Sequence, residues 1–199
     1  ETDLLIIGSG AREHSFVWKI FNSKHDIKIF ATNPNAGFSK ISTCVDVDIN
    51  DFVSIKKLII NHSVDIVLIG PEIPLINGIA DFINNDSDLQ DVNVIGPSQK
   101  GSMLEGSKEF AKNFMAKYNI PTASYKSFDK STFDQALSFI NKNRPPYVLK
   151  ADGPAAGKGV IIVNDPDEAV KNLEDMLLNS KFGKSSEKVV IEELSLIHI

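Results

Sequence analysis

The chain has 199 residues, of which 42% are hydrophobic and 24% charged, a composition typical of a globular protein with one large domain or two small ones. The net charge of −5 does not favour a nucleic-acid partner or an anionic membrane surface as partner. The single cysteine, Cys44, excludes an intrachain disulfide, so we expect a buried structural thiol in a cytoplasmic protein. No apolar run approaches the roughly 18 residues of a membrane span and no basic-then-apolar leader is visible, so neither a transmembrane helix nor a signal peptide is expected.

The chain opens with a strand, a glycine turn and a helix. Residues 3–7 are an apolar run that predicts a buried strand, Gly8–Gly10 form the turn, and from Ala11 the apolar spacing becomes helical. Free N–H groups and the dipole at the start of a helix attract anions, and Arg12 and His14 add donors. We therefore expect a phosphate group to bind here, with a purely structural turn as the alternative.

This turn departs from the dinucleotide-binding fingerprint in two ways. Glu13 stands at the position of the third glycine, where it is expected to crowd the contact between helix and strand. The second strand, predicted at 27–31, is followed by Thr32 and Asn33 rather than by an acid that could bind a ribose. An NAD site is therefore not expected.

Strands and helices continue to alternate to about residue 97. Strands are predicted at 44–49, 66–69 and 92–95, and helices after an Asp51 cap and from Pro74. This alternation predicts an α/β fold over residues 1–98, a Rossmann-like, open and mostly parallel sheet with helices on both faces. Its ligand site should lie beyond the carboxyl ends of the strands, where Asn35–Gly37 and Gly70–Glu72 also lie.

The pattern changes after Ser98. Residues 99–122 predict a helical connector, and residues 123–194 predict a small α+β lobe separate from the first domain. In this part, helices are expected from Ser107, after a Ser131 cap and from Pro166, and strands at 147–149, 160–163 and 188–191.

A glycine-rich loop, K-A-D-G-P-A-A-G-K-G-V at Lys150–Val160, connects two of these strands. Its three glycines let backbone N–H groups approach a ligand and Lys158 adds a positive charge, so we expect the loop to cover the phosphates of a nucleotide. An ordinary hairpin turn is the alternative. A P-loop is excluded because Asp152 replaces its first glycine and Gly159 replaces its hydroxyl residue.

Several charged residues gain significance beside these two turns. Glu72 follows a strand in the crevice of the first turn, where a carboxylate can bind sugar hydroxyls or an amine, although a solvated acid at a helix start is common. Glu192 and Glu193 close the last strand on opposite faces, so only one needs to contact a nucleotide. Lys108 and Lys150 are within reach of nucleotide phosphates, although a lone lysine is usually solvated.

Seven motifs, in this order, resemble those of the phosphoribosylamine–glycine ligase (glycinamide ribonucleotide synthetase) family of the ATP-grasp superfamily. They are G-S-G-A-R-E-H at 8–14, N-A-G at 35–37, G-P-E-x-P-L at 70–75, E-x-S-K at 105–108, I-P-T-A at 120–123, K-A-D-G-x-A-A-G-K-G-V at 150–160 and V-I-E-E at 190–193. The long loop motif is the most specific of them.

The resemblance implies a fold and a reaction. The fold is a pre-ATP-grasp domain followed by the small lobe of an ATP-grasp domain. In the reaction, ATP phosphorylates the carboxylate of glycine, and the amine of 5-phosphoribosylamine attacks the acyl phosphate, which gives glycinamide ribonucleotide, ADP and phosphate in purine synthesis. Fusion to other purine-pathway domains is left open.

The resemblance also implies site residues. The loop residues with a catalytic role are Lys158, Gly157 and Gly159. The ATP-binding residues are Lys108, Lys150, Gly153, Ala155, Ala156, Gly157, Lys158, Gly159, Glu192, Glu193 and Leu194. The residues that bind phosphoribosylamine are Gly8, Ser9, Gly10, Ala11, Arg12, Glu13, Asn35, Ala36, Gly37, Gly70, Pro71 and Glu72.

Three positions depart from the family pattern. Pro34 replaces a glycine, and Pro154 replaces a leucine and stiffens the loop. Residues 195–199 do not fit the family's continuation, in which the magnesium-binding acids and the glycine site are expected. We therefore expect a truncated enzyme that has no metal ligands and no ligase activity by itself. A stand-alone sugar-phosphate or nucleotide-binding module and another ATP-grasp carboxylate–amine ligase are the alternatives.

Overall fold

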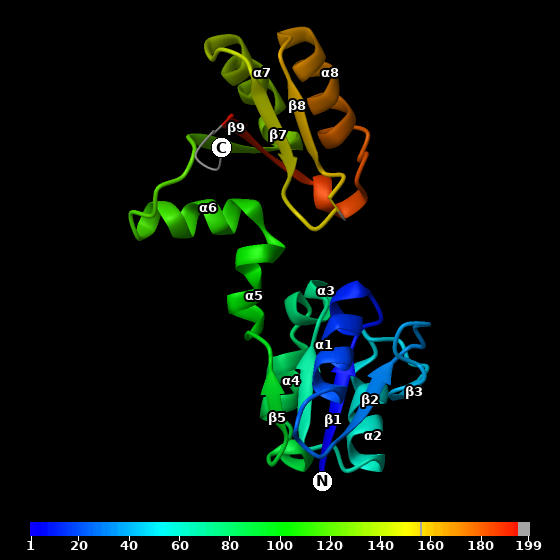
Figure 1. Cartoon of the computed structure of the whole chain (residues 1–199). Coiled ribbons are helices and arrows are strands. Elements are labelled where there is room, and N and C mark those ends of the chain that lie inside the picture. Colours follow the sequence, from blue (N-terminus) through cyan, green and yellow to red (C-terminus); the bar gives the residue numbers. More distant parts are fainter. Residues whose placement is uncertain (156, 195–199) are drawn as a thin grey trace. The chain divides into compact units, whose positions relative to one another are not determined.

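The computed structural model describes residues 1–155 and 157–194 (Figure 1). The chain divides into two compact units, Glu1–Ser102 and a second unit that begins at Met103. The finer four-part division predicted from the sequence stays a prediction. No helix in the part of the chain that the structure describes has the length and apolar character needed to cross a membrane.

The first unit is built on a five-stranded parallel sheet. Its strands are β1 (Thr2–Ile7), β2 (Ile27–Thr32), β3 (Thr43–Val45), β4 (Ile66–Ile69) and β5 (Asn93–Ile95). Their order across the sheet is β3-β2-β1-β4-β5. Leu4 at the centre pairs with Ile29 on one side and Ile66 on the other, so β1 is the middle strand on which the sheet is built. All carboxyl ends of the strands consequently meet at one edge.

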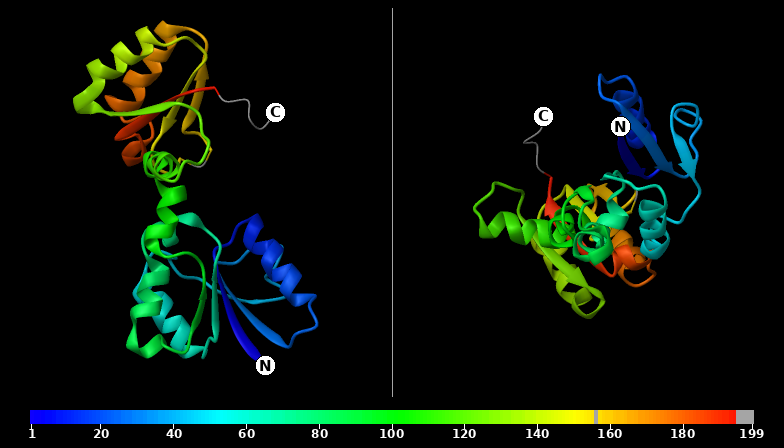
Figure 2. Two further views of the ribbon diagram at one scale, coloured as in Figure 1. Left: turned by 90° about the vertical axis from the view of Figure 1, so that its left-hand side faces the viewer. Right: turned by 90° about the horizontal axis from the view of Figure 1, so that it is seen from below.

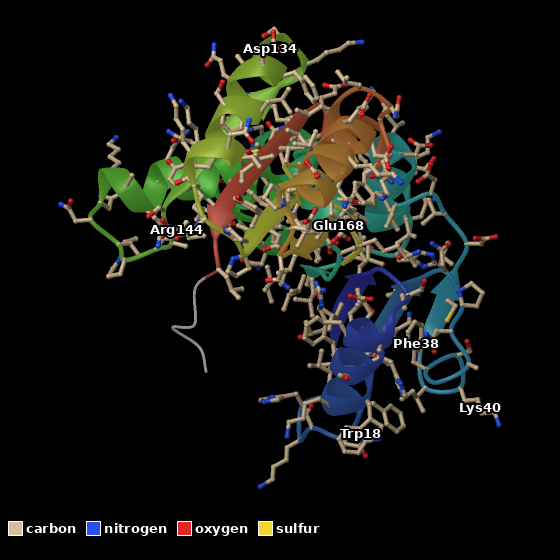
Figure 3. The ribbon with its side chains drawn as sticks, turned by 90° about the horizontal axis from the view of Figure 1, so that it is seen from above. Trp18, Phe38, Lys40, Asp134, Arg144 and Glu168 are labelled. Atoms are coloured by element: carbon tan, nitrogen blue, oxygen red, sulfur yellow. The ribbon has the colours of Figure 1, made fainter. Side chains whose placement is uncertain are left out.

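Helices cover both faces of this sheet. They are α1 (Ala11–Phe21), α2 (Phe52–Asn61), α3 (Glu72–Ile76) and α4 (Ile79–Asn85), and α5 (Gln99–Gly106) follows. Leu4 and Ile6 pack with Val17 of α1 and with Phe38, which lies beside α1 in Figure 3. Leu5 and Ile7 point to the opposite face and pack against α2, α3 and α4. This two-sided burial confirms the expected α/β fold.

Three local expectations for the first unit were wrong. Pro74 does not begin a helix, since α3 begins at Glu72 and the proline occupies its first turn, where its missing N–H has no partner in the helix. Gly78, at φ 96°, then separates α3 from α4. The strand expected at 44–49 pairs only over Thr43–Val45, and Cys44 is half-buried rather than buried.

The second unit contains a four-stranded antiparallel sheet. Its strands are β6 (Tyr125–Asp129), β7 (Tyr147–Ala151), β8 (Val160–Val163) and β9 (Lys188–Glu193), in the order β6-β9-β7-β8. Its helices are α6 (Lys108–Lys117), α7 (Phe133–Lys142) and α8 (Pro166–Leu177). The left view of Figure 2 shows α7 and α8 side by side on the same face of the sheet, where Leu149 and Ile191 are buried against them. The opposite face carries Lys150 and Glu192, one residue further along each strand.

Two features of the second unit were not expected from the sequence. The short strand β6 was not predicted, and it exists because it pairs with β9, with Phe128 opposite Val189. Ser131 does not cap α7: it lies in a 3₁₀ helix, Lys130–Thr132, that leads into α7 and is capped by Asp129. The Asp129 carboxylate accepts the N–H groups of Ser131 and Thr132 at 2.9 and 3.1 Å. The hydrogen bonds of the Ser131 and Thr132 hydroxyl groups, and then those of the two N–H groups, lower the pKa of Asp129.

Candidate functional site

A hollow of about 500 Å³ lies at the carboxyl edge of the parallel sheet, where the glycine turn leaves β1. We call it the glycine-turn hollow. It is lined by Gly8, Ser9, Gly10, Ala11, Arg12, Glu13, Asn33, Ile49, Pro71 and Glu72. The structure thus brings the first predicted motif together with Pro71 and Glu72, which are some sixty residues away in the chain.

Hydrogen bonds from the turn to side chains hold it in shape. Gly8, at φ 112°, donates its N–H to the hydroxyl of buried Thr32 at 2.7 Å. Gly10 donates its N–H to the Glu13 carboxylate at 2.7 Å, an acidic cap at the start of α1. The turn is therefore preorganised before any ligand arrives.

Glu13 does not crowd the contact between helix and strand as expected from the sequence. Its side chain is only 5% exposed, and it fits because two glycines adjoin it. A Cβ atom at Gly8 would lie 2.9 Å from the Glu13 carboxyl carbon, and one at Gly70 would lie 2.6 Å from it. Glu13 thus has a structural role as the cap of α1, and its predicted role in substrate binding stays a prediction.

Two charged side chains stand at the border of this hollow. Arg12 donates a hydrogen bond of 2.5 Å to the carbonyl of Gly70, and its other terminal nitrogen lies 4.0 Å from the Glu72 carboxylate. Both side chains are solvent-exposed, so the ion pair adds little to stability. Arg12 is therefore free to exchange this contact for a bound anion.

The Asn35–Gly37 segment supports the turn without lining the hollow. The Asn35 amide donates to the carbonyl of Ser9 at 2.6 Å, and Gly37 lies directly against the His14 ring, with no room for a side chain. Ala36 and Gly70 do not line the hollow either. Asn33 and Ile49 do line it and were not expected from the sequence; the detectable signal was an asparagine after a strand, Asn33, which here adopts φ 61°.

A second hollow, of about 480 Å³, lies on the face of the antiparallel sheet that α7 and α8 leave uncovered. We call it the open-face hollow. It is lined by Lys112, Met115, Pro121, Thr122, Ala123, Val148, Lys150, Val160, Ile162, Glu192, Glu193 and Leu194. Four predicted residues, Lys150, Glu192, Glu193 and Leu194, lie here. The apolar lining from β7 and β8 was missed because alternation alone does not reveal which face stays uncovered.

Three charged side chains form an ion cluster in the open-face hollow. The Glu192 carboxylate lies 2.7 Å from the ammonium group of Lys112 and 2.5 Å from that of Lys150. Lys112 and Glu192 are buried, whereas Lys150 is partly exposed. Glu193, on the opposite face as expected, is exposed and accepts a hydrogen bond from Ser124 at 3.0 Å.

Of the glycine loop's described residues, the two at its ends, Lys150 and Val160, line this hollow. Gly153 packs against Ser185, and Gly159 packs so closely on Ala155 that a Cβ would lie 2.7 Å from the methyl group of Ala155. Gly157 adopts φ 77° in open space, a conformation that glycine adopts without strain. The side chain of Lys158 is exposed. Ala156, another predicted loop residue, lies outside the described residues.

Lys108 lies at the base of the loop. Its ammonium group is 3.4 and 3.3 Å from the carbonyl oxygens of Asp152 and Gly153. Asp152 anchors this helix start, since its carboxylate accepts the N–H of Glu109 at 2.7 Å. Burial lowers the pKa of Lys108 below its ordinary value, and an anion beside it would favour the charged form again.

The described residues, 1–155 and 157–194, include no group of three or more His, Cys, Asp and Glu side chains that could hold a metal ion. We therefore assign no metal ligand to them.

Comparison with protein families identifies both units in the expected order. Residues 2–105 match the model of the phosphoribosylglycinamide synthetase N domain, and residues 106–196 match that of the phosphoribosylglycinamide synthetase ATP-grasp (A) domain. The chain belongs to the phosphoribosylglycinamide synthetase family. The resemblance drawn from the motifs is thereby confirmed.

Curated relatives carry matching names. The chain is 40% identical over 191 residues to a phosphoribosylamine–glycine ligase of Caldanaerobacter subterraneus, covering 96% of this chain and 44% of the relative. It is 42% identical to the ligase of Fusobacterium nucleatum, with 96% and 43% covered. A bifunctional purine biosynthetic protein of Pichia angusta is 39% identical, with 96% and 24% covered. The chain thus spans less than half the length of the synthetases it matches.

Solved structures share the fold of this chain. The phosphoribosylamine–glycine ligase of Thermotoga maritima matches with a TM-score of 0.75 and 28% identity, covering 97% of this chain and 44% of that one. An ADP complex of N5-carboxyaminoimidazole ribonucleotide synthetase matches with a TM-score of 0.71 and 17% identity, covering 98% and 47%. At that identity the second match supports the fold alone.

Proposed function

We propose that this chain supplies the phosphoribosylamine-binding and ATP-binding parts of a phosphoribosylamine–glycine ligase. In the proposed reaction, glycine and ATP form glycyl phosphate and ADP, and the amine of 5-phosphoribosylamine displaces phosphate to give glycinamide ribonucleotide. The observation that carries this proposal is the match of two consecutive domains of one synthetase family over residues 2–196. A cytoplasmic location in de novo purine synthesis is part of the same proposal.

The open-face hollow is the proposed site of ATP. Val148 and Ile162 offer an apolar surface for a flat purine ring, and the neighbouring Glu193 and Leu194 offer backbone groups at the end of a strand. Lys150 has an ammonium group close to this surface and is partly exposed, which suits a phosphate ligand.

The glycine loop and Lys108 are proposed to hold the transferring phosphate. Gly157, in open space, leaves its backbone N–H group unshielded by side chains, Gly159 lets the loop pack against Ala155, and Lys158 supplies a charge where negative charge develops. Covering the phosphate also keeps water from a labile acyl phosphate. Gly153 and Ala155 anchor the two sides of the loop.

The glycine-turn hollow is the proposed site of phosphoribosylamine. The start of α1, with Ser9 and Ala11 beside the turn, offers N–H groups and a favourable dipole to the phosphate. Arg12 supplies a cation, and Glu72 is positioned to accept a hydrogen bond from a ribose hydroxyl or the amine. Asn35–Gly37 holds the turn from the outside.

Titration calorimetry with ATP, ribose 5-phosphate and NAD tests this assignment. We expect ATP and ribose 5-phosphate each to bind once, at independent sites, and NAD not to bind. Lys150→Met should weaken ATP binding about tenfold without changing ribose 5-phosphate binding, because the charge-assisted contact of the Lys150 ammonium with an ATP phosphate is lost. Binding of NAD without binding of ribose 5-phosphate would overturn the ligase assignment in favour of a dinucleotide-binding module.

A further inference from the structure

The two lysines of the ion cluster in the open-face hollow differ in how many partners their ammonium groups have. A lysine ammonium has three donors. The ammonium group of Lys112 donates hydrogen bonds to the hydroxyl of Thr122 at 2.8 Å and the carbonyl of Ala123 at 3.2 Å, and it lies 2.7 Å from the Glu192 carboxylate. With these three partners and a side chain that is 9% exposed, Lys112 is engaged within the protein and not directed at a ligand.

Lys150 is in the opposite situation. Among the residues that the structure describes, Glu192 is the one charged partner of its ammonium group, and the side chain is 28% exposed. The Glu192 oxygen that faces Lys150 lies in close contact with it but accepts no hydrogen bond of proper geometry from the described residues. Lys150 therefore keeps donors for a ligand in the hollow.

The charges of the cluster sum to about +1, from two ammonium groups and one carboxylate. If Lys112 were absent, the sum would be zero and the buried carboxylate would hold Lys150 as its one remaining counter-ion. A phosphate group would then have to compete with Glu192 for that ammonium. With Lys112 in place, the carboxylate keeps a permanent partner when Lys150 turns to a ligand.

We propose that Lys112 is a positioning residue for nucleotide phosphate binding: it holds and neutralises Glu192 from the buried side, so that Lys150 retains its charge for a phosphate of the nucleotide. This inference rests on the proposed function of the open-face hollow. Lys112 acts through Glu192 and Lys150 and does not touch the ligand. Its effect should consequently appear with phosphorylated ligands and not with the nucleoside.

Calorimetric titration of the chain with ATP and with adenosine tests this inference. Lys112→Met should weaken ATP binding about tenfold, because Lys150 then has to neutralise Glu192 as well as the phosphate, and should leave adenosine binding within about threefold of that of the unchanged protein. Lys117→Met, which removes an exposed lysine of the same helix, should change the affinity for neither ligand by more than about twofold. Equal weakening of ATP and adenosine by Lys112→Met would show a purely structural role and overturn the inference.

A second pair of variants removes the buried carboxylate charge as well. In Glu192→Gln no carboxylate competes with the phosphate for Lys150. Adding Lys112→Met to this variant should therefore weaken ATP binding by less than about threefold. A further tenfold loss in this pair would overturn the inference, even if Lys112→Met alone fails to fold. No ATP binding by the unchanged protein would overturn the proposed function itself, whereas ATP binding that Lys112→Met leaves unchanged would overturn the inference alone.

Discussion

Replacement of Gly70 by alanine should destabilise the first unit, because Gly70 leaves the space that Glu13 fills. The new methyl group would lie 2.6 and 2.7 Å from the carboxyl and γ carbons of Glu13, which is buried between helix and strand. Forcing an extra methyl group into a packed site costs about 1–3 kcal/mol. Displacing Glu13 from the N–H of Gly10 removes a helix cap, which costs about 1 kcal/mol more. We therefore expect a loss of about 2–4 kcal/mol in the free energy of unfolding.

Urea unfolding followed by the fluorescence of Trp18 measures this loss. Trp18 is the single tryptophan of the chain and lies on α1, the helix that Glu13 caps, where Figure 3 shows it. Gly101→Ala in helix α5 is the matched control, since a Cβ there would lie 3.4 Å from its nearest neighbour, the Cβ of Pro97. Alanine is the better helix former, so the control should be neutral or stabilising by up to about 1 kcal/mol.

The double variant Gly70→Ala with Glu13→Ala isolates the cause. Removing the Glu13 side chain removes the clash, so Gly70→Ala should cost less than about 0.5 kcal/mol when Glu13 is already alanine. If Gly70→Ala alone costs less than that, or if its cost is the same in both backgrounds, the steric argument is refuted.

Three further predictions concern the two hollows and the Asp129 cap before α7. Arg12→Met should weaken the binding of ribose 5-phosphate about tenfold in calorimetry. It should leave the unfolding midpoint unchanged, because the Arg12 side chain is exposed; an unchanged affinity would contradict the phosphate site. Ile162→Asp should weaken adenosine about tenfold while the fold persists, since Ile162 is 55% exposed in the open-face hollow; undiminished adenosine binding would place the purine elsewhere. Asp129→Asn should destabilise the second unit at pH 7. Because hydrogen bonds lower the pKa of Asp129 in the folded state, that stability is present above pH 3.8 and is lost as the pH falls through the folded pKa. The difference between the two proteins in thermal unfolding should therefore shrink below pH 3.8, and a constant difference would argue against the cap.

Helices and strands with strong local signals were predictable from the sequence. Asp51 caps α2 by accepting the N–H of Ser54 at 3.1 Å, and α8 begins at Pro166 as expected. Both depend on residues within one turn of the chain. Helix α5 lies within the helical connector expected at 99–122, whereas β6 was missed because only its pairing with β9 makes it a strand.

The sequence by itself determined the order of strands and helices, the family, and the residues that carry its motifs. These follow from periodicity and from short, specific residue patterns, which are properties of neighbouring residues. Only the tertiary structure decided how Glu13 fits beside Gly70, that Lys112 holds Glu192, and which sheet face stays open around Ile162. Each of these is a contact between residues far apart in the chain, and its chemistry depends on burial and on partners that no local pattern specifies.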